Sequence, residues 1–203
     1  MASRGILFII SGPAGSGKGT VVKALRSLMP SLALSVSATT RQPRPGEAEG
    51  VSYYFKSRSV FEKMIADGEI LEHTEYMGNY YGTLSSEVRR CLDGGLDLVL
   101  EIEVEGAGQI KKLYPDSVAV MLIPPDSCTL EARLRGRGTE TEEVIVGRLA
   151  RAREELSMAS SYDYIVVNGD GAPEECAEKI RAIITAEKCR TARMSDTVSA
   201  FFD

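Results

Sequence analysis

The chain has 203 residues, of which 43% are hydrophobic and 26% charged, and its net charge at pH 7 is −5. This length allows one compact domain with a substantial core, and the acidic balance argues against a partner that is a nucleic acid or an anionic membrane. No apolar stretch approaches the roughly 20 residues that a membrane-spanning helix needs. The four cysteines are scattered without CxxC spacing, so we expect a cytoplasmic protein with reduced cysteines.

Strand-like and helix-like segments alternate along most of the chain. A continuous apolar run at 5–10 predicts a buried strand, and residues 18–28 have helical spacing that ends before Pro30. Three more strands are predicted at 97–102, 118–123 and 164–167. Four more helices are predicted at 106–113, 127–135, 142–158 and 173–187. This alternation predicts an α/β fold with a mostly parallel sheet, helices on both faces and right-handed crossovers.

Three segments depart from this alternation. Residues 37–84 combine prolines, glycines and short aromatic runs with a helix-like stretch at 59–67, which predicts an inserted small lobe with short antiparallel strands. Residues 136–141 are a polar, glycine-bearing break between two helices, as expected of a mobile lid. Residues 191–203 have no helical or strand pattern and are predicted to be a flexible tail.

A glycine-rich segment, GPAGSGKGT, lies between the first predicted strand and the first predicted helix. Glycines let successive backbone N–H groups face phosphate oxygens, and the helix N-terminus and a lysine add positive charge. The alternative is a glycine-rich turn with a surface lysine, which the combination of spacing and context disfavours. We therefore expect the segment to bind ATP through Gly12, Pro13, Ala14, Gly15, Ser16, Gly17, Lys18, Gly19 and Thr20.

One position of this segment departs from the strict phosphate-binding pattern. That pattern has Ser or Thr directly after the lysine, whereas here Gly19 comes before Thr20. Thr20 is the candidate protein ligand for the Mg²⁺ that accompanies ATP. The alternative is an ion held by waters and phosphates alone.

Two arginines in the predicted lobe indicate a second phosphate site. Arg41 and Arg44 lie three residues apart in a proline-stiffened turn, and guanidinium groups bind phosphate oxygens in pairs. Ser37, Tyr53 and Tyr81 could add hydroxyl donors around the same phosphate. For this segment alone, a solvated Arg-Pro loop is the competing interpretation.

Glu72, in the same lobe, is a candidate for recognising a guanine base. A carboxylate accepts hydrogen bonds from both N1–H and the 2-amino group of guanine, and adenine offers neither donor on that edge. Thr83 could donate to the guanine carbonyl. An exposed glutamate in a hairpin is the commoner alternative for such a residue.

Six segments together resemble the guanylate kinase family, from about residue 5 to residue 187. They are GPAGSGKGT (12–20), SVSATTRQPRPGE (35–47), LEHTEYMGNYYGT (71–83), LEIEVEGA (100–107), RLRGRGTETEE (133–143) and YDYIVVN (162–168). The resemblance implies a P-loop NTPase three-layer fold with a parallel central sheet, an inserted nucleotide-monophosphate-binding lobe and a small helical lid. We expect a single domain at 4–190, with the core at 4–36, 85–125 and 162–190, the GMP-binding lobe at 37–84 and the lid at 126–161.

The resemblance also implies an activity and residue roles. The activity is transfer of a phosphoryl group from ATP to GMP, with Lys18, Arg41, Arg137 and Arg148 as catalytic residues and Asn168 near the adenine. The GMP-binding residues would be Ser37, Arg41, Arg44, Tyr53, Glu72, Tyr81, Thr83 and Glu103. Family members usually have Asp and Gln where this chain has Glu103 and Glu105, and Glu103 keeps a carboxylate that could reach guanine or a magnesium-bound water.

Such a transfer requires in-line positioning and neutralisation of charge, and no general base, because the GMP phosphate is already anionic. We expect Mg²⁺, Lys18, Arg137 and Arg148 to supply the charge. Arg151 and Arg153 are interpreted as solvated helix residues with glutamate partners such as Glu154 and Glu155.

Three other functions compete with this one. A non-catalytic phosphopeptide-binding module of the same fold is disfavoured by Lys18 and Arg137. A kinase for another small phosphate acceptor is disfavoured by Glu72 and Thr83. A P-loop protein that acts on nucleic acid is disfavoured by the acidic balance.

Overall fold

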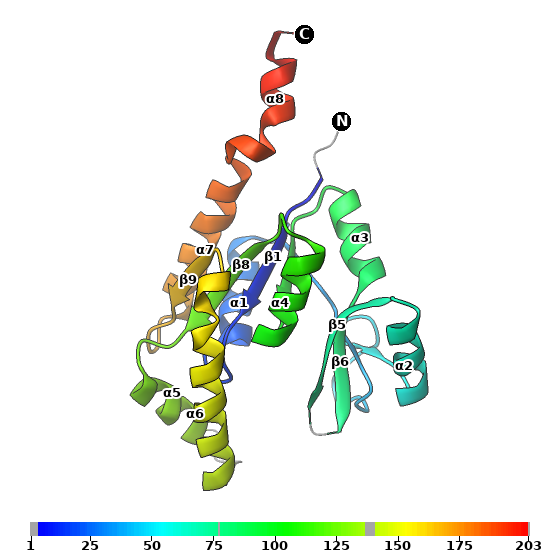
Figure 1. The fold of residues 1–203 in the computed structure, drawn as a ribbon. Helices are drawn as coiled ribbons and strands as arrows, with labels where there is room; N and C mark the ends of the chain where they lie inside the picture. The colour runs from blue at the N-terminus through cyan, green and yellow to red at the C-terminus, as the bar shows by residue number, and fades with distance from the viewer. Residues whose placement is uncertain (1–3, 77, 137–140, 203) are drawn as a thin grey trace.

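The structure, a computed structural model, describes residues 4–76, 78–136 and 141–202. Figure 1 shows a central sheet with a small lobe that contains β5, β6 and α2 on one side and the helices α5 and α6 on the other. This is the arrangement of core, inserted lobe and helical lid that the sequence predicts. Within the described ranges, no helix has the length and apolar character that a membrane crossing demands.

The central sheet has five strands in the order β2-β7-β1-β8-β9, and every neighbouring pair is parallel. The strands are β1 (Leu7–Ser11), β2 (Ala33–Leu34), β7 (Leu98–Glu101), β8 (Val118–Ile123) and β9 (Tyr164–Val167). The parallel sheet and four of its strands are confirmed. The strand β2 could not be predicted, because a two-residue strand shows no periodicity of its own and exists only by pairing with β7.

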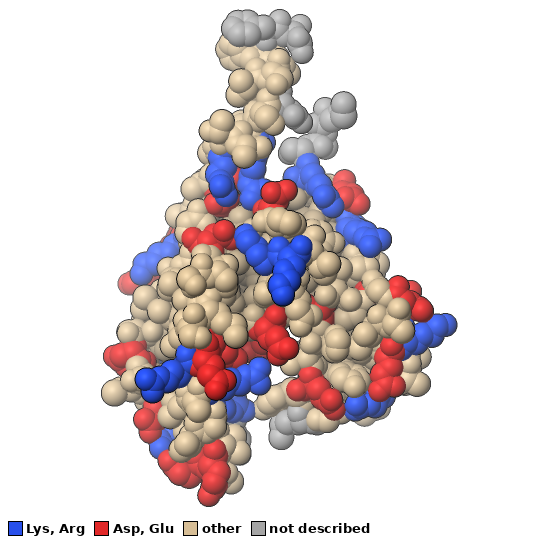
Figure 2. Space-filling view, viewed as in Figure 1, with Lys and Arg blue, Asp and Glu red and all other residues tan. Residues whose placement is uncertain are grey.

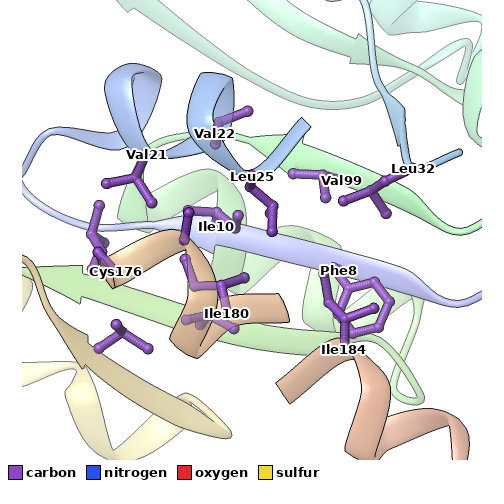
Figure 3. Packing of buried hydrophobic residues seen from close by; sticks show 14 of the residues in the cluster. Phe8, Ile10, Val21, Val22, Leu25, Leu32, Val99, Cys176, Ile180 and Ile184 are labelled. Carbon is purple, nitrogen blue, oxygen red and sulfur yellow. The ribbon is translucent and has the colours of Figure 1, made fainter. Parts of the chain in front are cut away.

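Alternate residues of β1 build two cores on opposite faces of the sheet. Phe8 and Ile10 pack on α1 (Lys18–Leu28) and α7 (Pro173–Lys188), the cluster drawn in Figure 3. Leu7 and Ile9 pack in a second cluster with α3 (Ser85–Asp93) and α4 (Val104–Leu113). The result is three layers, helices on both faces of a parallel sheet, as predicted.

The inserted lobe has its own four-stranded sheet, in the order β4-β3-β6-β5. Its elements are β3 (Ala38–Thr39), β4 (Tyr54–Phe55), α2 (Arg58–Ala66), β5 (Ile70–Tyr76) and β6 (Asn79–Leu84). The pairs β5–β6 and β3–β6 are antiparallel as predicted, but β3–β4 is parallel. The expectation of antiparallel strands alone was wrong. The connection over residues 40–53 is long enough to bring the chain back to the end of the sheet where β3 begins, so β4 runs in the same direction as β3.

The lid consists of α5 (Ser127–Arg135) and α6 (Glu142–Ser157), followed by a single turn, η1 (Ala159–Ser161). Leu130, Leu134 and Ile145 form its small core, and Ala14 of the phosphate-binding segment packs against that core. Both helices are confirmed. Most of the predicted glycine-bearing break, including Arg137, lies outside the described residues.

The chain beyond residue 190 folds into short helical turns. These are η2 (Thr191–Arg193), α8 (Ser195–Ser199) and η3 (Ala200–Phe202), which extend away from the body in Figure 1. The sequence of this segment shows no helical pattern, because such short turns contain too few apolar residues to show a period. Its flexibility stays a prediction.

A buried carboxylate links this segment to the core. Glu187, at 2% exposure, accepts a hydrogen bond from the Tyr164 hydroxyl (2.6 Å) and lies 3.3 Å from Arg190 and 3.4 Å from Arg193. Burial opposes ionisation, but these hydrogen bonds outweigh it and hold the pKa of Glu187 below its ordinary value. A lowered folded-state pKa adds stability above the unfolded pKa of about 4.3, and that stability is lost as pH falls through the folded pKa.

We expect Tyr164→Phe to lower the free energy of unfolding by about 1.5–3 kcal/mol at pH 7, because it removes a hydrogen bond to a buried charge. Urea unfolding of the variant and the parent, measured from pH 7 down to the carboxyl range, checks this. The difference should shrink as Glu187 becomes protonated. A difference that stays constant with pH would show that the carboxylate charge is not involved.

Candidate active site

The phosphate loop, residues 12–20, joins the carboxyl end of β1 to the start of α1. Gly12, Gly15 and Gly17 have positive φ angles of 148°, 92° and 90°, which residues with a side chain rarely adopt. A Cβ at Gly12 would lie 2.0 Å from the Leu122 carbonyl oxygen. No side chain caps the N-terminus of α1 at Gly17, so its first N–H groups are available to an anion.

Lys18 lies folded over this loop. Its Nζ donates to the Gly12 carbonyl (2.6 Å) and lies 3.4 Å from Oε2 of Glu103. Its side chain is 11% exposed, whereas that of Glu103 is 41% exposed. The ammonium group is therefore held at the mouth of the loop, where phosphate oxygens would replace its contacts.

Asn168, which directly follows β9, supports the phosphate loop from the protein side. It is 5% exposed, and its Nδ2 donates to the Ser16 carbonyl at 2.8 Å. A Cβ at Gly17 would lie 2.4 Å from that Nδ2. Asn168 is not among the residues that line the cleft below, so its visible contact is with the loop backbone.

One cleft of about 740 Å³ runs from the phosphate loop between the lobe and the lid. Figure 2 shows acidic and basic side chains close together along this region. Of the residues predicted from the sequence, the cleft is lined by Pro13, Ala14, Gly15, Gly17, Lys18, Gly19, Thr20, Ser37, Tyr53, Glu72, Tyr81, Glu103 and Arg148. Gly12, Ser16, Arg41, Arg44, Thr83 and Asn168 are not among its lining residues, and Arg137 lies outside the described residues.

The predicted phosphate-binding residues of the lobe gather around two tyrosines. The rings of Tyr53 and Tyr81 are 6.0 Å apart, and the Arg41 guanidinium lies 5.4 Å from the centre of the Tyr53 ring. Arg41 also pairs with Glu47 at 2.7 Å, a contact that lowers the pKa of Glu47. The exposed Arg44 belongs to the same turn, where its backbone N–H donates to Glu47 at 2.8 Å. A bound phosphate would compete with Glu47 for Arg41.

Glu72 is a buried carboxylate and not an exposed hairpin residue. It is 5% exposed and lines the cleft, and Oε1 accepts a hydrogen bond from the Thr83 hydroxyl at 2.6 Å. Burial raises the pKa of Glu72, while the hydrogen bonds from Thr83 oppose the rise. The single proton of the Thr83 hydroxyl is used in this contact, so Thr83 orients Glu72 in the structure.

The space for Glu72 is provided by a glycine of the core. A Cβ at Gly106 of α4 would lie 2.5 Å from Oε2 of Glu72, so the carboxylate fits only because position 106 has no side chain. A carboxylate that is buried, hydrogen-bonded on one oxygen and directed into a cleft is suited to accept two adjacent donors from a base.

We expect Gly106→Ala to displace the Glu72 carboxylate and to raise the KM for GMP by about 10-fold or more, since a methyl group would occupy space within van der Waals range of Oε2. The KM for ATP should change much less, because the phosphate loop is untouched. Steady-state kinetics check both values. The matched control is Gly108→Ala in the same helix, where a Cβ would meet nothing within 4 Å; equal effects of the two variants would contradict the proposed clash.

The family model that describes guanylate kinase matches residues 4–187. The chain belongs to the guanylate kinase family. A guanylate kinase of Halalkalibacterium halodurans is 50% identical over 191 residues, which cover 94% of this chain and 93% of the relative. One of Streptococcus thermophilus is 50% identical over 195 residues, or 96% of this chain and 92% of the relative.

A crystal structure of guanylate kinase from Anaplasma phagocytophilum superposes with a TM-score of 0.73 at 33% identity. The match covers 94% of this chain and 90% of that one. The similarity therefore extends through core, lobe and lid. The predicted family and the P-loop kinase fold are both confirmed.

Several residues that line the cleft of this chain were not predicted from the sequence as site residues. Glu101 ends β7, next to Lys18 and the phosphate loop; burial raises its pKa and Lys18 opposes the rise. Its position in the sequence could have indicated this role, because Glu101 is a carboxylate at the carboxyl end of β7, the strand that pairs with β1. Tyr76, Arg151 and Glu155 also line the cleft and were missed as site residues.

The lid reaches across the cleft through Arg148. Its Nη2 donates to the Tyr76 hydroxyl at 2.7 Å, and the guanidinium lies 5.9 Å from the centre of the Tyr76 ring. Tyr76 is the last residue of β5, so this contact joins lid and lobe. In guanylate kinase chemistry both nucleotides would have to fit between these two residues and the phosphate loop.

Proposed function

We propose that this chain transfers the γ-phosphoryl group of ATP to GMP and releases ADP and GDP. The observation that carries the proposal is a single cleft that connects the phosphate loop with the buried carboxylate of Glu72. The loop that would bind the triphosphate and the carboxylate that would recognise guanine thus line the same cleft. Family membership supports the same activity.

On the donor side, the phosphate loop would hold the ATP phosphates through its backbone N–H groups, with Lys18 on the outer phosphates. Asn168 would keep the loop in shape through its bond to Ser16. We place its role in support of the loop, since Nδ2 bonds the loop backbone and the residue does not line the cleft.

On the acceptor side, Ser37, Tyr53, Tyr81, Arg41 and Arg44 would bind the GMP phosphate. Their proximity supports this role: the tyrosine rings are adjacent, and Arg41 lies over one of them. Guanidinium forks match phosphate oxygens in pairs. Arg41 would leave Glu47 for the phosphate and could serve donor and acceptor together.

The guanine base would be held in the cleft wall by Glu72. Its two carboxylate oxygens would accept from N1–H and the 2-amino group, with Thr83 fixing the carboxylate and Glu103 in reach of the amino group. An adenine would leave this buried carboxylate without donors, so AMP should be a poor acceptor.

The chemistry needs charge stabilisation and alignment. The GMP phosphate oxygen attacks without a general base, and Lys18, Arg148 and Arg137 would stabilise negative charge on the migrating group. Closure of lid and lobe would exclude water and limit hydrolysis of ATP.

Magnesium fits the oxygen donors of this cleft. The described residues contain no cluster of three His, Cys, Asp or Glu side chains that could hold a metal alone, but Thr20, Glu101 and Glu103 line the cleft near the phosphate loop. Hard cations prefer such oxygens and keep several waters. Thr20 would bind the ion directly or through water, and the two carboxylates would orient its waters. When bound, the ion neutralises phosphate charge.

A cytoplasmic site of action agrees with the four free cysteines. We propose no nucleic-acid or membrane partner.

An acceptor screen tests the proposal. The purified chain is incubated with ATP and Mg²⁺ and with GMP, AMP, CMP or UMP in separate reactions, and ADP formation is followed. Turnover with GMP alone is expected. Turnover with another acceptor would keep the kinase and reject guanine, and binding of nucleotide without any turnover would favour the non-catalytic phosphopeptide-binding module.

A further inference from the structure

The face of the lid helix α6 that lines the cleft carries two charged residues in addition to Arg148, which was predicted from the sequence. Arg148, Arg151 and Glu155 all line the cleft, and residues three and four apart share a face of an α-helix. Arg151 was interpreted from the sequence as a solvated helix residue with a glutamate partner. The partner exists, since Nε of Arg151 lies 2.9 Å from Oε1 of Glu155, but both residues line the cleft.

The Arg151–Glu155 pair differs from the other arginine–glutamate pairs of the described residues in that both of its members line the cleft. In Arg58–Glu62, both side chains are about half exposed, at 49% and 52%. In Arg151–Glu155 the arginine is 57% exposed and the glutamate only 9%. A buried carboxylate therefore binds Nε of a guanidinium that lines the cleft, and this contact restricts where the guanidinium can lie.

The cleft carries more negative than positive side chains, so a further cation would help it to bind anionic nucleotides. Its described lining residues include five carboxylates and only three cations, and those cations are Lys18, Arg148 and Arg151. Two polyanionic nucleotides have to bind in this negatively charged space, so each cation counts.

Arg151 lies within electrostatic range of the charged groups around Lys18. The charges of Glu103 and Glu105 help to raise the pKa of Arg151, after the larger effect of its hydrogen bond to Glu155. Burial raises the pKa of Glu155, and the charges of Arg151 and Lys18 oppose that rise. Glu103 in turn contacts Lys18. The side chains of Lys18, Glu103, Arg151 and Glu155 form one electrostatic group beside the phosphate loop.

We propose that Arg151 is a further catalytic residue, a lid cation that contacts the donor phosphates during transfer, and that Glu155 is its positioning residue. The proposal rests on the phosphotransfer activity proposed above. Arg151 would stabilise charge that develops on the migrating group, in addition to Lys18 and Arg148, while Glu155 holds the guanidinium on the cleft side of α6.

The test compares Arg151→Gln with Arg153→Gln, a matched variant of an exposed arginine on the same helix that does not line the cleft. With ATP, Mg²⁺ and GMP, we expect Arg151→Gln to lower kcat by about 10-fold or more, with the KM for GMP nearly unchanged. Arg153→Gln should stay within about twofold of the parent. Arg151→Lys, which keeps the charge without the fork, should fall between.

Two further measurements separate catalysis from helix stability. Arg151→Gln should weaken the complex of ADP, aluminium fluoride and GMP, a mimic of the transferring state, by a similar factor and leave binding of ADP alone unchanged. Glu155→Gln should lower kcat in the parent but not in the Arg151→Gln background, because it acts through Arg151. Melting temperatures verify that each variant is folded.

A kcat of Arg151→Gln equal to that of Arg153→Gln, with normal parent turnover, would overturn the inference and leave the proposed function intact. Additive effects of Glu155→Gln and Arg151→Gln would overturn it as well, because the glutamate would then act independently of the arginine. A parent without GMP turnover would instead reject the proposed function.

Discussion

Replacing Lys18 by alanine should lower kcat for ATP and GMP by about 10³-fold or more and leave the fold intact. The ammonium group lies at the mouth of the phosphate loop, 2.6 Å from the Gly12 carbonyl and 3.4 Å from Glu103. It is one of the few cations in a cleft with a surplus of carboxylates. Loss of a pre-positioned charge at a transferring phosphoryl group costs several orders of magnitude in rate.

Steady-state assays of ADP formation measure this loss, and thermal unfolding verifies the fold. Stability should change little, because Glu103 is 41% exposed and can be solvated once Lys18 is gone. Lys23→Ala is the matched control, since Lys23 is an exposed lysine of the same helix that lies away from the main cleft. A Lys18→Ala variant that keeps a tenth of the parent kcat would remove Lys18 from the catalytic residues.

The second large effect is expected at Glu72. Glu72→Gln should lower kcat/KM for GMP by at least about 10²-fold and leave the weak reaction with AMP unchanged, so that selectivity for guanine collapses. A glutamine keeps the volume, but it offers one acceptor and one donor where guanine presents two donors. Kinetics with GMP and AMP in parallel give the ratio.

The pH dependence of the parent provides an independent check. Because burial raises the pKa of Glu72, the carboxylate becomes protonated at a higher pH than an exposed glutamate, and the KM for GMP should rise as pH falls through that pKa. Glu72→Gln should lack this rise. Glu62→Gln, a change at an exposed residue of the same lobe that pairs with Arg58 and does not line the cleft, should retain it. If Glu72→Gln kept both selectivity and pH dependence, the guanine reader would have to be another group.

The parts of this fold that the sequence predicted are those in which one segment determines its own structure. The helices 18–28 and 127–135 have the predicted bounds, because their apolar spacing and flanking residues act locally. The phosphate loop likewise follows from its glycines and lysine. By contrast, β2 is too short for a pattern of its own and depends on pairing with β7. The helix α3 was not predicted although Val88, Cys91 and Leu92 follow helical spacing on its buried face.

The candidate site divides in the same way. Lys18, Glu72 and the two tyrosines carry chemistry in recognisable segments and line the cleft as expected. Glu101, Tyr76 and Glu155 were missed because their roles depend on what faces them across the fold. Glu155 resembles any helix glutamate in the sequence, and only its burial beside the phosphate loop distinguishes it. The orientation of Glu72 by Thr83 and the fit over Gly106 also required the tertiary structure.

The fit of Glu72 over Gly106 has a consequence for how the molecule moves. The carboxylate belongs to β5 of the lobe, whereas the glycine that accommodates it belongs to α4 of the core. A displacement of the lobe relative to the core would therefore take the Glu72 carboxylate out of the space beside Gly106 in which it is buried. If Glu72 reads guanine as proposed, base recognition would then depend on the position of the lobe, and a ligand that holds the lobe against α4 would also favour that recognition.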